Sequence, residues 1–591
     1  MDRRNFFKTA AAGALTTLLP SRILRSQLRS DQDPLLQRLA SAADDYHPYD
    51  NELFEAAERI VFLGPHEAWL NVIPKAGKNL DLRLAKSGEG LSIQGDFSRQ
   101  WTSRDVGNGL SIHGHSSSQL IGVDDSTDIP LLINFRAPEL TYRLEYRESG
   151  KGSWKSTAER RVKTPFSFSQ TGRMEVILIS DDHTFDDADM GARIVYNPLL
   201  REARLNGDYV NMYLNELQYD PNFLPDPSAE SGKMISGFCL ASTIHQVLEN
   251  ERPDFILILG DSTGIGASYK WKGLGLKDPM SGLTSQDRDD IAKLFWLRMR
   301  KMYSALTPHI PIYFVQGNHD GESGYDAERD FAKKYRRKYF KQPGFRQGGS
   351  TDENFFPLLW GADFFNGGAP LFLILDNESY NLSESGVMPL RPEDWTLGTQ
   401  QKTWLRELLA YDTEWKFAFF HHVLGGWPRG TNESLTDYAY GRGPLFIYDD
   451  YKDYCVDPNL VEQVELTQAM MNNRLNAIFY GHDHIFHPRL IPGGSSQEMY
   501  GICVGSSKHV GELDWYKGPL WQKFYGTYGH YWTEPSEASP LTTFWSPSGY
   551  TKITITPGST KVEYKRAAFN HPYANLPPSA RPGDVIHTLS L

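Results

Sequence analysis

The stretch IYFVQGNHD, residues 312–320, joins a short apolar run to a group of polar side chains. Its first four residues are β-branched or aromatic, which favours a buried strand. Polar residues directly after such a strand lie at its carboxyl end, where open α/β sheets place their functional sites. The stretch therefore predicts an α/β fold with a site that includes Asn318, His319 and Asp320.

Four other segments repeat this pattern of a buried strand followed by polar residues. They are Met174–Ile179 before Ser180-Asp181-Asp182-His183, Phe255–Leu259 before Gly260-Asp261, Phe417–Phe420 before His421-His422, and Ala477–Tyr480 before Gly481-His482-Asp483-His484. Helical periodicity fills stretches between them, as in Ile291–Tyr303 and Gln400–Leu409. Alternating strands and helices predict a layered α/β domain, to which we assign residues 169–510.

The polar residues of these five segments have the chemistry of metal ligands. Carboxylates, imidazoles and an amide oxygen suit divalent or trivalent ions such as Fe, Zn, Mn or Co. Two such ions about 3.5–4 Å apart can hold a shared hydroxide and clamp a phosphate group. The expected ligand sets share one carboxylate: Asp181, His183, Asp261 and His484 for one ion, and Asp261, Asn318, His421 and His482 for the other.

In their order the five motifs resemble the calcineurin-like metallophosphoesterase superfamily. Its pattern is Asp-x-His, Gly-Asp, Gly-Asn-His-Asp/Glu, a lone His, and Gly-His-x-His. The resemblance implies a four-layer α/β/β/α sandwich, hydrolysis of phosphate esters, and metal binding by the seven residues above. It also implies that His319 contacts the phosphate or protonates the leaving oxygen, and that Asp320 orients His319.

Two of these assignments have alternatives. Asp182 also lies in the first motif, but the two-residue spacing to His183 favours Asp181. At the histidine pair the family uses the first member, so we expect His421 to be the ligand and His422 to be a candidate substrate contact. The proline that usually follows is absent here.

The N-terminal third resembles the arrangement of purple acid phosphatases, which also carry a β-sandwich before the catalytic domain. Residues 59–168 contain short runs of β-forming residues separated by turn residues, which predicts an antiparallel Ig- or fibronectin-like β-sandwich. The tyrosine ligand of that group corresponds to Gly264 in this sequence. We therefore expect no tyrosinate-to-iron charge transfer.

The two ends of the chain carry other signals. Arg3-Arg4-Asn5-Phe6-Phe7-Lys8 and the apolar run Thr9–Leu19 resemble a twin-arginine signal peptide, to which we assign residues 1–30. We therefore expect an exported protein, periplasmic or extracellular. No later run is apolar for long enough to predict a stable membrane anchor. Residues 31–58 are predicted as a linker, and residues 511–591 as loops, a β-hairpin and an arm.

Charge and cysteine content limit the function. The net charge of -12 over 591 residues argues against a nucleic-acid partner, which a basic surface would favour. A small phosphorylated substrate remains compatible, because metal ions supply local positive charge. The basic residues between Lys333 and Lys338 are expected on a helix surface. The three cysteines match neither a zinc motif nor a disulfide framework.

Together these features predict an exported binuclear-metal phosphoesterase. Phosphate monoesters are favoured as substrates by the order of sandwich and catalytic domain, which is an argument from fold analogy. Two alternatives remain open: a phosphodiesterase or nucleotidase with the same metal site, and a non-catalytic, metal-stabilised surface binding protein.

Overall fold

The structure of the chain is a computed structural model. It describes residues 49–64, 67–85, 92–93, 103–105, 110–113, 121–123, 125–133, 138–185, 207–208, 210–211, 214–215, 236–267, 276, 282–344, 349–360, 368–380, 396–422, 462–482, 484, 486–492, 498–507, 548–567 and 581–591. The predicted signal peptide and most of the predicted linker lie outside these residues.

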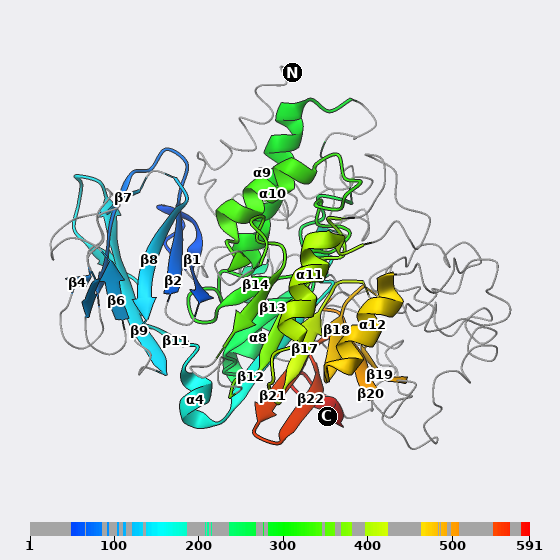
Figure 1. Cartoon of the computed structure of the whole chain (residues 1–591). Helices are drawn as coiled ribbons and strands as arrows, with labels where there is room; N and C mark the ends of the chain where they lie inside the picture. Colours follow the sequence, from blue (N-terminus) through cyan, green and yellow to red (C-terminus); the bar gives the residue numbers. More distant parts are fainter. Residues whose placement is uncertain are drawn as a thin grey trace.

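The N-terminal part forms two antiparallel sheets that pack on each other (Figure 1). Leu70, Leu82 and Leu144 are among the buried residues between them. The first sheet has the order β1-β2-β8-β6-β5, and the second has the order β10-β9-β3-β4, with β7 paired to β3 and β11 paired to β9. The bounds are β1 (Phe54–Gly64), β2 (Glu67–Pro74), β3 (Leu80–Ala85), β4 (Ser92–Ile93), β5 (Ser103–Asp105), β6 (Leu110–His113), β7 (Ile121–Val123), β8 (Thr127–Ile133), β9 (Glu139–Glu148), β10 (Lys155–Ser156) and β11 (Arg160–Lys163).

The first strand begins earlier than the sequence predicted. β1 starts at Phe54, inside the stretch expected to be a linker, and pairs with β2 from Phe54 onward. Register shifts between Phe54 and Ala56, and again between Ala56 and Arg59, interrupt the regular alternation of the strand. Because β-bulges of this kind break the period of two, the sequence pattern alone did not reveal this part of the strand.

Two six-stranded mixed sheets form the centre of the catalytic region (Figure 1). One has the order β14-β13-β12-β21-β22-β23 and the other β15-β16-β17-β18-β20-β19. Strands β12, β13 and β14 are parallel, as are β16, β17, β18 and β20. The bounds are β12 (Met174–Ile179), β13 (Phe255–Ile258), β14 (Ile312–Phe314), β15 (Phe356–Leu359), β16 (Leu371–Ile374), β17 (Lys416–Phe419), β18 (Ala477–Tyr480), β19 (Phe486–Pro492), β20 (Glu498–Val504), β21 (Gly549–Thr556), β22 (Ser559–Arg566) and β23 (Val585–Ser590).

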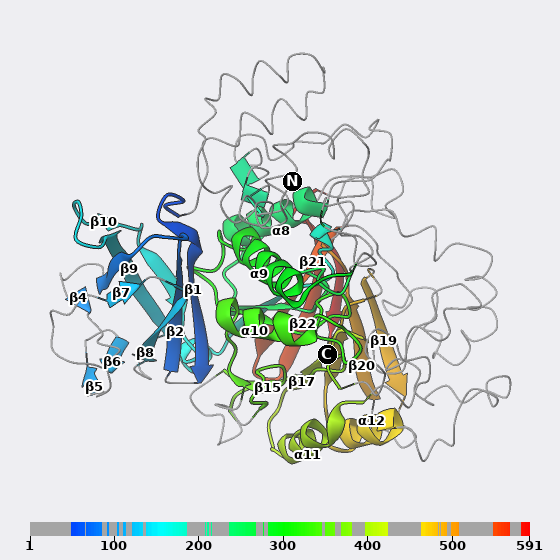
Figure 2. The same ribbon diagram turned by 90° about the horizontal axis from the view of Figure 1, so that it is seen from above.

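Helices cover the outer face of each sheet, which gives the expected four layers (Figure 2). Helices α8, α9 and α10 pack on Ile177 and Ile256 of the first sheet. Helices α11 and α12 pack on Leu373 and Ile478 of the second. The helix bounds are α4 (Ser167–Thr171), α8 (Ser236–Asn250), α9 (Ser285–Met302), α10 (Arg329–Tyr339), α11 (Gly398–Leu409) and α12 (Glu462–Asn472).

Local sequence sets several element ends. Helix α9 begins before the predicted Ile291 because Thr284 and Asp287 form a capping box, in which each side chain bonds the backbone N–H of the other. The predicted C-terminal β pair is present, but it is part of the first catalytic sheet, since β21 pairs antiparallel with β12. The predicted arm likewise ends in β23, which pairs with β22.

The sandwich and the catalytic region share one buried core. The cluster that contains Phe62 of β1 also contains Trp360, and the two rings meet edge to face at 5.4 Å. The buried guanidinium of Arg59 donates to Ile312 O at 2.7 Å and to Lys341 O at 2.9 Å. Hydrogen bonds of this kind, between buried groups of both parts, make the sandwich a packed component of the molecule.

Two further findings concern membrane spans and cysteines. Within the described residues, no helix is both long enough and apolar enough to cross a membrane. Cys239 and Cys503 are buried free thiols, and Cys455 lies outside the described residues.

Candidate metal centre

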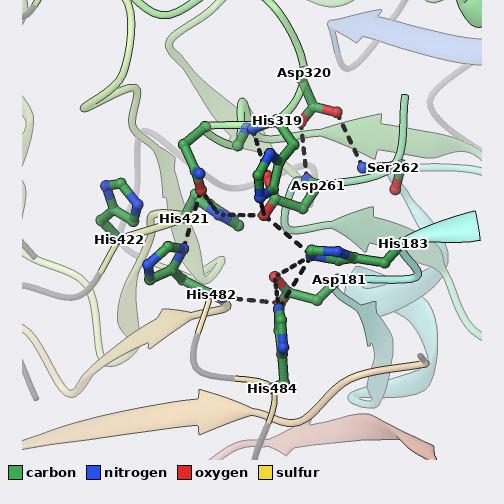
Figure 3. A network of polar contacts seen from close by, with 12 residues as sticks. Asp181, His183, Asp261, Ser262, His319, Asp320, His421, His422, His482 and His484 are labelled. Atoms are coloured by element: carbon green, nitrogen blue, oxygen red, sulfur yellow. Dashed lines mark hydrogen bonds and ion pairs between the residues drawn. The ribbon is translucent and has the colours of Figure 1, made fainter. Parts of the chain in front are cut away.

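The loops after β12, β13, β14, β17 and β18 converge on one site, which Figure 3 shows. Parallel neighbours end on the same edge of a sheet, so the polar residues behind each strand meet there. All seven residues predicted as ligands lie at this site, and so do His319 and Asp320.

Four of them form a compact group: Asp181, His183, Asp261 and His484 each offer a ligand atom within 4.8 Å of the others. His183 Nε2 lies 3.7 Å from Asp181 Oδ1 and 3.2 Å from Asp261 Oδ2. His484 Nε2 lies 3.4 Å from Asp181 Oδ1 and 3.1 Å from His183 Nε2. Two carboxylates and two imidazoles, all buried, suit a first-row transition metal or zinc.

The other predicted residues lie beside this group. Asn318 Oδ1 is 3.0 Å from both His421 Nε2 and His482 Nδ1, and His421 Nε2 is 3.3 Å from Asp261 Oδ2. His421 Nδ1 lies 2.6 Å from Leu259 O. A carbonyl oxygen only accepts, so Nδ1 carries a proton and Nε2 is the ring nitrogen that faces the site.

Each of the two aspartates has one oxygen held by the protein and one without a donor. Asp181 Oδ2 accepts hydrogen bonds from the Ser180 hydroxyl and from the His482 N–H, and Asp261 Oδ1 accepts from the His319 N–H at 2.8 Å. Asp181 Oδ1 and Asp261 Oδ2 are buried without a hydrogen-bond donor. Buried anionic oxygens are costly unless a cation compensates them, so the residues fit bound metal.

The ionisation of Asp181 and Asp261 also fits bound metal. Burial by itself would raise the pKa of Asp181, but the neighbouring imidazoles of His183 and His484 hold that pKa below the ordinary carboxyl value. Burial also opposes ionisation of Asp261, and His421 together with His319 lowers its pKa well below the ordinary value. Both carboxylates are therefore anionic at neutral pH.

The backbone of the site lies in an uncommon conformation. Five of the seven predicted ligands have a positive φ, between 42° and 68°: Asp181, His183, Asp261, His482 and His484. Left-handed backbone is rare for residues other than glycine, and its concentration at one place indicates a constraint that serves the site. No sequence signal reports this.

The three motif glycines are required for the loops to approach one another. A Cβ on Gly481 would lie 2.1 Å from Ser180 Oγ, and a Cβ on Gly317 would lie 2.3 Å from Asp261 Oδ1. A Cβ on Gly260 would lie 2.6 Å from His421 Nδ1. Since real Cβ atoms do not come this close to other atoms, only glycine fits at these positions.

Asp320 accepts backbone hydrogen bonds that the sequence did not predict. Its Oδ1 accepts from the N–H groups of Ser262 and Thr263, and its Oδ2 accepts from those of Asp261 and Gly317, all at 2.8–3.0 Å. This buried carboxylate therefore fixes the loop that carries Asp261. That it also orients His319 stays a prediction. The family pattern located the residue, but a pattern cannot show which way a carboxylate turns.

Asp182 turns away from the metal-ligand group. Its Oδ2 accepts from the Tyr303 hydroxyl and the Ser262 hydroxyl, each at 2.7 Å. Burial raises its pKa to about 6. Asp181, rather than Asp182, lies beside His183 and His484, as the spacing of the motif predicted.

His319 borders the group and is open to solvent. Its side chain is 18% exposed, whereas the side chain of Asp261 is 1% exposed. Its Nε2 lies 3.9 Å from Asp261 Oδ2, and its ring is 5.2 Å from that of His183. The ring can therefore reach a substrate while it stays next to the metal-ligand group.

Sequence reasoning missed one residue of the site. Glu378 follows β16, and its Oε1 lies 2.7 Å from His422 Nδ1. His422, His421 and His482 form a second group that could hold a metal ion. The signal was present in the sequence, because Asp376-Asn377-Glu378 follows a buried strand in the same way as the five motifs do.

The basic residues of α10 are compensated by acidic neighbours. Lys334 pairs with Asp289 at 2.6 Å, and Lys338 pairs with Asp125 at 2.6 Å. Acidic side chains therefore offset these two surface charges. Arg336, which was also expected on the helix surface, is instead buried and paired with Glu322 at 2.7 Å.

The chain is similar to a known protein family and to solved structures. Residues 238–486 match the family described as calcineurin-like phosphoesterase. No curated protein sequence matches the chain significantly. Among solved structures the chain is similar to PhoD, with 12% identity, a TM-score of 0.51, and coverage of 91% of this chain and 90% of that chain. It also aligns with purple acid phosphatase PPD1 from yellow lupin (Lupinus luteus) seeds, with 12% identity, a TM-score of 0.44, and coverage of 90% and 74%.

The similarity to PhoD concerns the fold, which it supports over nearly the whole length of both chains. The family match begins after Asp181 and His183, yet the structure places both residues in one group with Asp261 and His484 of the matched segment. Residues 238–486 are therefore similar to the calcineurin-like phosphoesterase family, and the structure joins them to Asp181 and His183 in one candidate metal site.

Proposed function

We propose that this protein is an exported phosphoesterase with a two-cation centre and that phosphate monoesters are its preferred substrates. The observation that supports two cations best is the position of Asp261 Oδ2. This buried oxygen has no donor and lies 3.2 Å from His183 Nε2 and 3.3 Å from His421 Nε2. An anionic oxygen between two sets of nitrogen ligands is suited to bridge two ions.

The residues divide into two ligand sets. Asp181, His183, Asp261 and His484 would hold one cation, and Asp261, Asn318, His421 and His482 the other. When bound, such a cation pair lowers the pKa of water toward neutrality and neutralises phosphate oxygens. His319 contacts the phosphate from the solvent side, and a proton on its Nε2 stabilises developing charge or passes to the leaving oxygen.

The residues near Gly264 argue against a tyrosine ligand to the metal. A Cβ at this position would lie 2.4 Å from Phe185 Cγ, and the backbone φ of +76° is unfavourable for other residues. A tyrosine ligand here, as in purple acid phosphatases, would require Phe185 to move. We propose ions drawn from Fe, Zn, Mn or Co, and an iron-loaded protein without a tyrosinate charge-transfer band in its visible spectrum.

The metal requirement can be tested on full-length protein purified without chelators. We expect elemental analysis to find two ions per chain, and removal of the ions to abolish phosphate release. Asp261→Ala should abolish activity and reduce bound metal. His319→Ala should lower kcat by about 10²- to 10⁴-fold, as expected for loss of a general acid, while metal content stays unchanged.

Substrate class is tested by assaying para-nitrophenyl phosphate and bis-para-nitrophenyl phosphate side by side. The proposal predicts a higher kcat/KM for the monoester. A higher value for the diester would support the phosphodiesterase or nucleotidase alternative. Absence of hydrolysis of both by the metal-loaded protein would favour the non-catalytic binding protein.

Export is supported by the twin-arginine pattern of residues 1–30. A reporter fused behind this segment should appear outside the cytoplasm, and Arg3→Lys combined with Arg4→Lys should retain it inside. Export that persists in the double variant would contradict the twin-arginine route.

A further inference from the structure

The structure contains a buried histidine–carboxylate pair beside the proposed second cation site. His422 and Glu378 are 1% and 0% exposed, and His422 Nδ1 lies 2.7 Å from Glu378 Oε1. Figure 3 shows His422 next to His421 and His482, and apart from Asp181 and His183. The proposed mechanism uses neither residue of the pair.

The fold delivers the two residues to one place. Strands β16 and β17 are parallel, and Ile374 pairs with Phe419 near their carboxyl ends, so the segments that follow run side by side. Asp376 accepts hydrogen bonds from the N–H groups of Glu378 and Ser379, which makes a tight turn after β16. This turn places Glu378 opposite the first residues after β17.

The turn is fixed on several sides. Asn377 donates to the carbonyl of His422 at 3.2 Å. Glu378 O accepts from the N–H of Gly324, and Glu378 Oε2 accepts from the Ser323 hydroxyl at 3.4 Å. The carboxylate is thus anchored to the loop that follows the Asn318 motif as well as to His422.

The ring of His422 packs directly on a predicted ligand. Its centroid lies 4.0 Å from that of His482, with the planes 81° apart, and 5.2 Å from that of His421. Edge-to-face packing at this distance restricts rotation of the His482 ring. In the proposed second cation site, His482 Nδ1 and Asn318 Oδ1 bind the same ion, and they lie 3.0 Å apart. The packing of His422 against the His482 ring helps to keep Nδ1 in this position.

We propose that Glu378 and His422 form a positioning pair: Glu378 fixes the ring of His422, and that ring holds His482 in the orientation that binds the second cation. Carboxylates that orient histidines near metals commonly change metal affinity by about 10- to 100-fold when removed. The inference rests on the proposed two-cation function.

The test is a double-mutant cycle on the full-length protein, with Glu378→Ala, His422→Ala and the double variant. Binding of the second Zn²⁺ or Mn²⁺ equivalent is measured by competition with a chelating dye, together with kcat and KM. Each single variant should weaken the second equivalent about 10- to 100-fold and leave the first unchanged. The double variant should be no weaker than either single variant, because the two residues act as one unit.

Other outcomes would overturn the proposal. Complete loss of the second ion in His422→Ala, with a mild effect in Glu378→Ala, would make His422 a ligand. Unchanged metal affinity in both, with a lower melting temperature, would make the pair only structural. Glu378→Gln keeps the shape and an acceptor oxygen, so it should restore most of the affinity lost in Glu378→Ala.

Glu251→Gln is the matched control. Glu251 is buried and ion-paired with Lys552 at 2.7 Å, and it precedes the amino end of β13, away from the site. This variant should lose stability without a change in metal affinity. If wild-type protein bound only one ion, the proposed function itself would fail; if wild type bound two and the variants matched it, only the positioning role would fail.

Discussion

The hydrogen bonds of Asp320 allow a quantitative prediction for Asp320→Asn. Each carboxylate oxygen accepts from two backbone N–H groups, so an amide of the same shape must turn its NH₂ toward one of the two pairs. Two buried N–H groups then lose their acceptor, at a cost of about 1–3 kcal/mol each, or roughly 2–6 kcal/mol in total. The free energy needed to open the loop that carries Asp261 should fall by this amount, so the loop should open more often.

Hydrogen exchange of the amides at positions 261–263 and 317 measures this opening in metal-free protein. At about 1.4 kcal/mol per factor of ten, the predicted acceleration is roughly 30-fold to 20,000-fold. Metal affinity should fall with it, because Asp261 is placed by the same loop.

Asp254→Asn is the matched control. Asp254 is also fully buried, but its Oδ2 accepts from the Glu175 N–H and from Lys163 Nζ, and its Oδ1 accepts from the Ser167 hydroxyl. An amide with its oxygen toward Glu175 and its NH₂ toward the Ser167 oxygen can satisfy all three partners. Exchange near Asp261 should be unchanged in this variant. If Asp320→Asn exchanged like wild type and retained its metal, the role assigned to Asp320 would be refuted.

Three further predictions follow from the same contacts. Gly481→Ala should reduce activity and bound metal, because its Cβ would lie 2.1 Å from Ser180 Oγ. Gly64→Ala, whose Cβ meets nothing within 4 Å, should leave the metal content found by elemental analysis unchanged. Arg59→Met should lower the free energy of unfolding by about 3–6 kcal/mol, because two charge-assisted hydrogen bonds are lost. Since these bonds join the sandwich to the catalytic region, probes placed in each part should report the same unfolding transition. Burial lowers the pKa of His309 from its ordinary value of about 6.5 to about 4. Its contribution to the free energy of unfolding, up to about 3 kcal/mol, is therefore complete above about pH 6.5 and is lost as pH falls toward 4. In denaturant unfolding, His309→Gln should flatten this pH dependence, and an unchanged pH profile would contradict the assignment.

Much of the catalytic fold could be predicted from the sequence because its strands are short, apolar and followed by polar motifs. The predicted strand Met174–Ile179 coincides with β12, and the predicted run Ala477–Tyr480 coincides with β18. The five motifs lie at carboxyl ends of parallel strands, so their convergence followed from the topology of α/β sheets.

Other features depend on contacts that a sequence pattern does not contain. The bulges of β1 hide its first residues, and the pairing of β21 with β12 joins segments far apart in the chain. The turn of Asp320 toward backbone N–H groups and the pairing of Glu378 with His422 are side-chain orientations, which periodicity and spacing do not encode.

The position of Asp261 between two ligand sets can be tested most directly by anomalous diffraction from crystals of the metal-loaded protein. The proposed two-cation centre predicts two anomalous peaks about 3.5–4 Å apart, with an oxygen of Asp261 bound to both. A single peak, or two peaks that do not share Asp261, would contradict the two-cation centre.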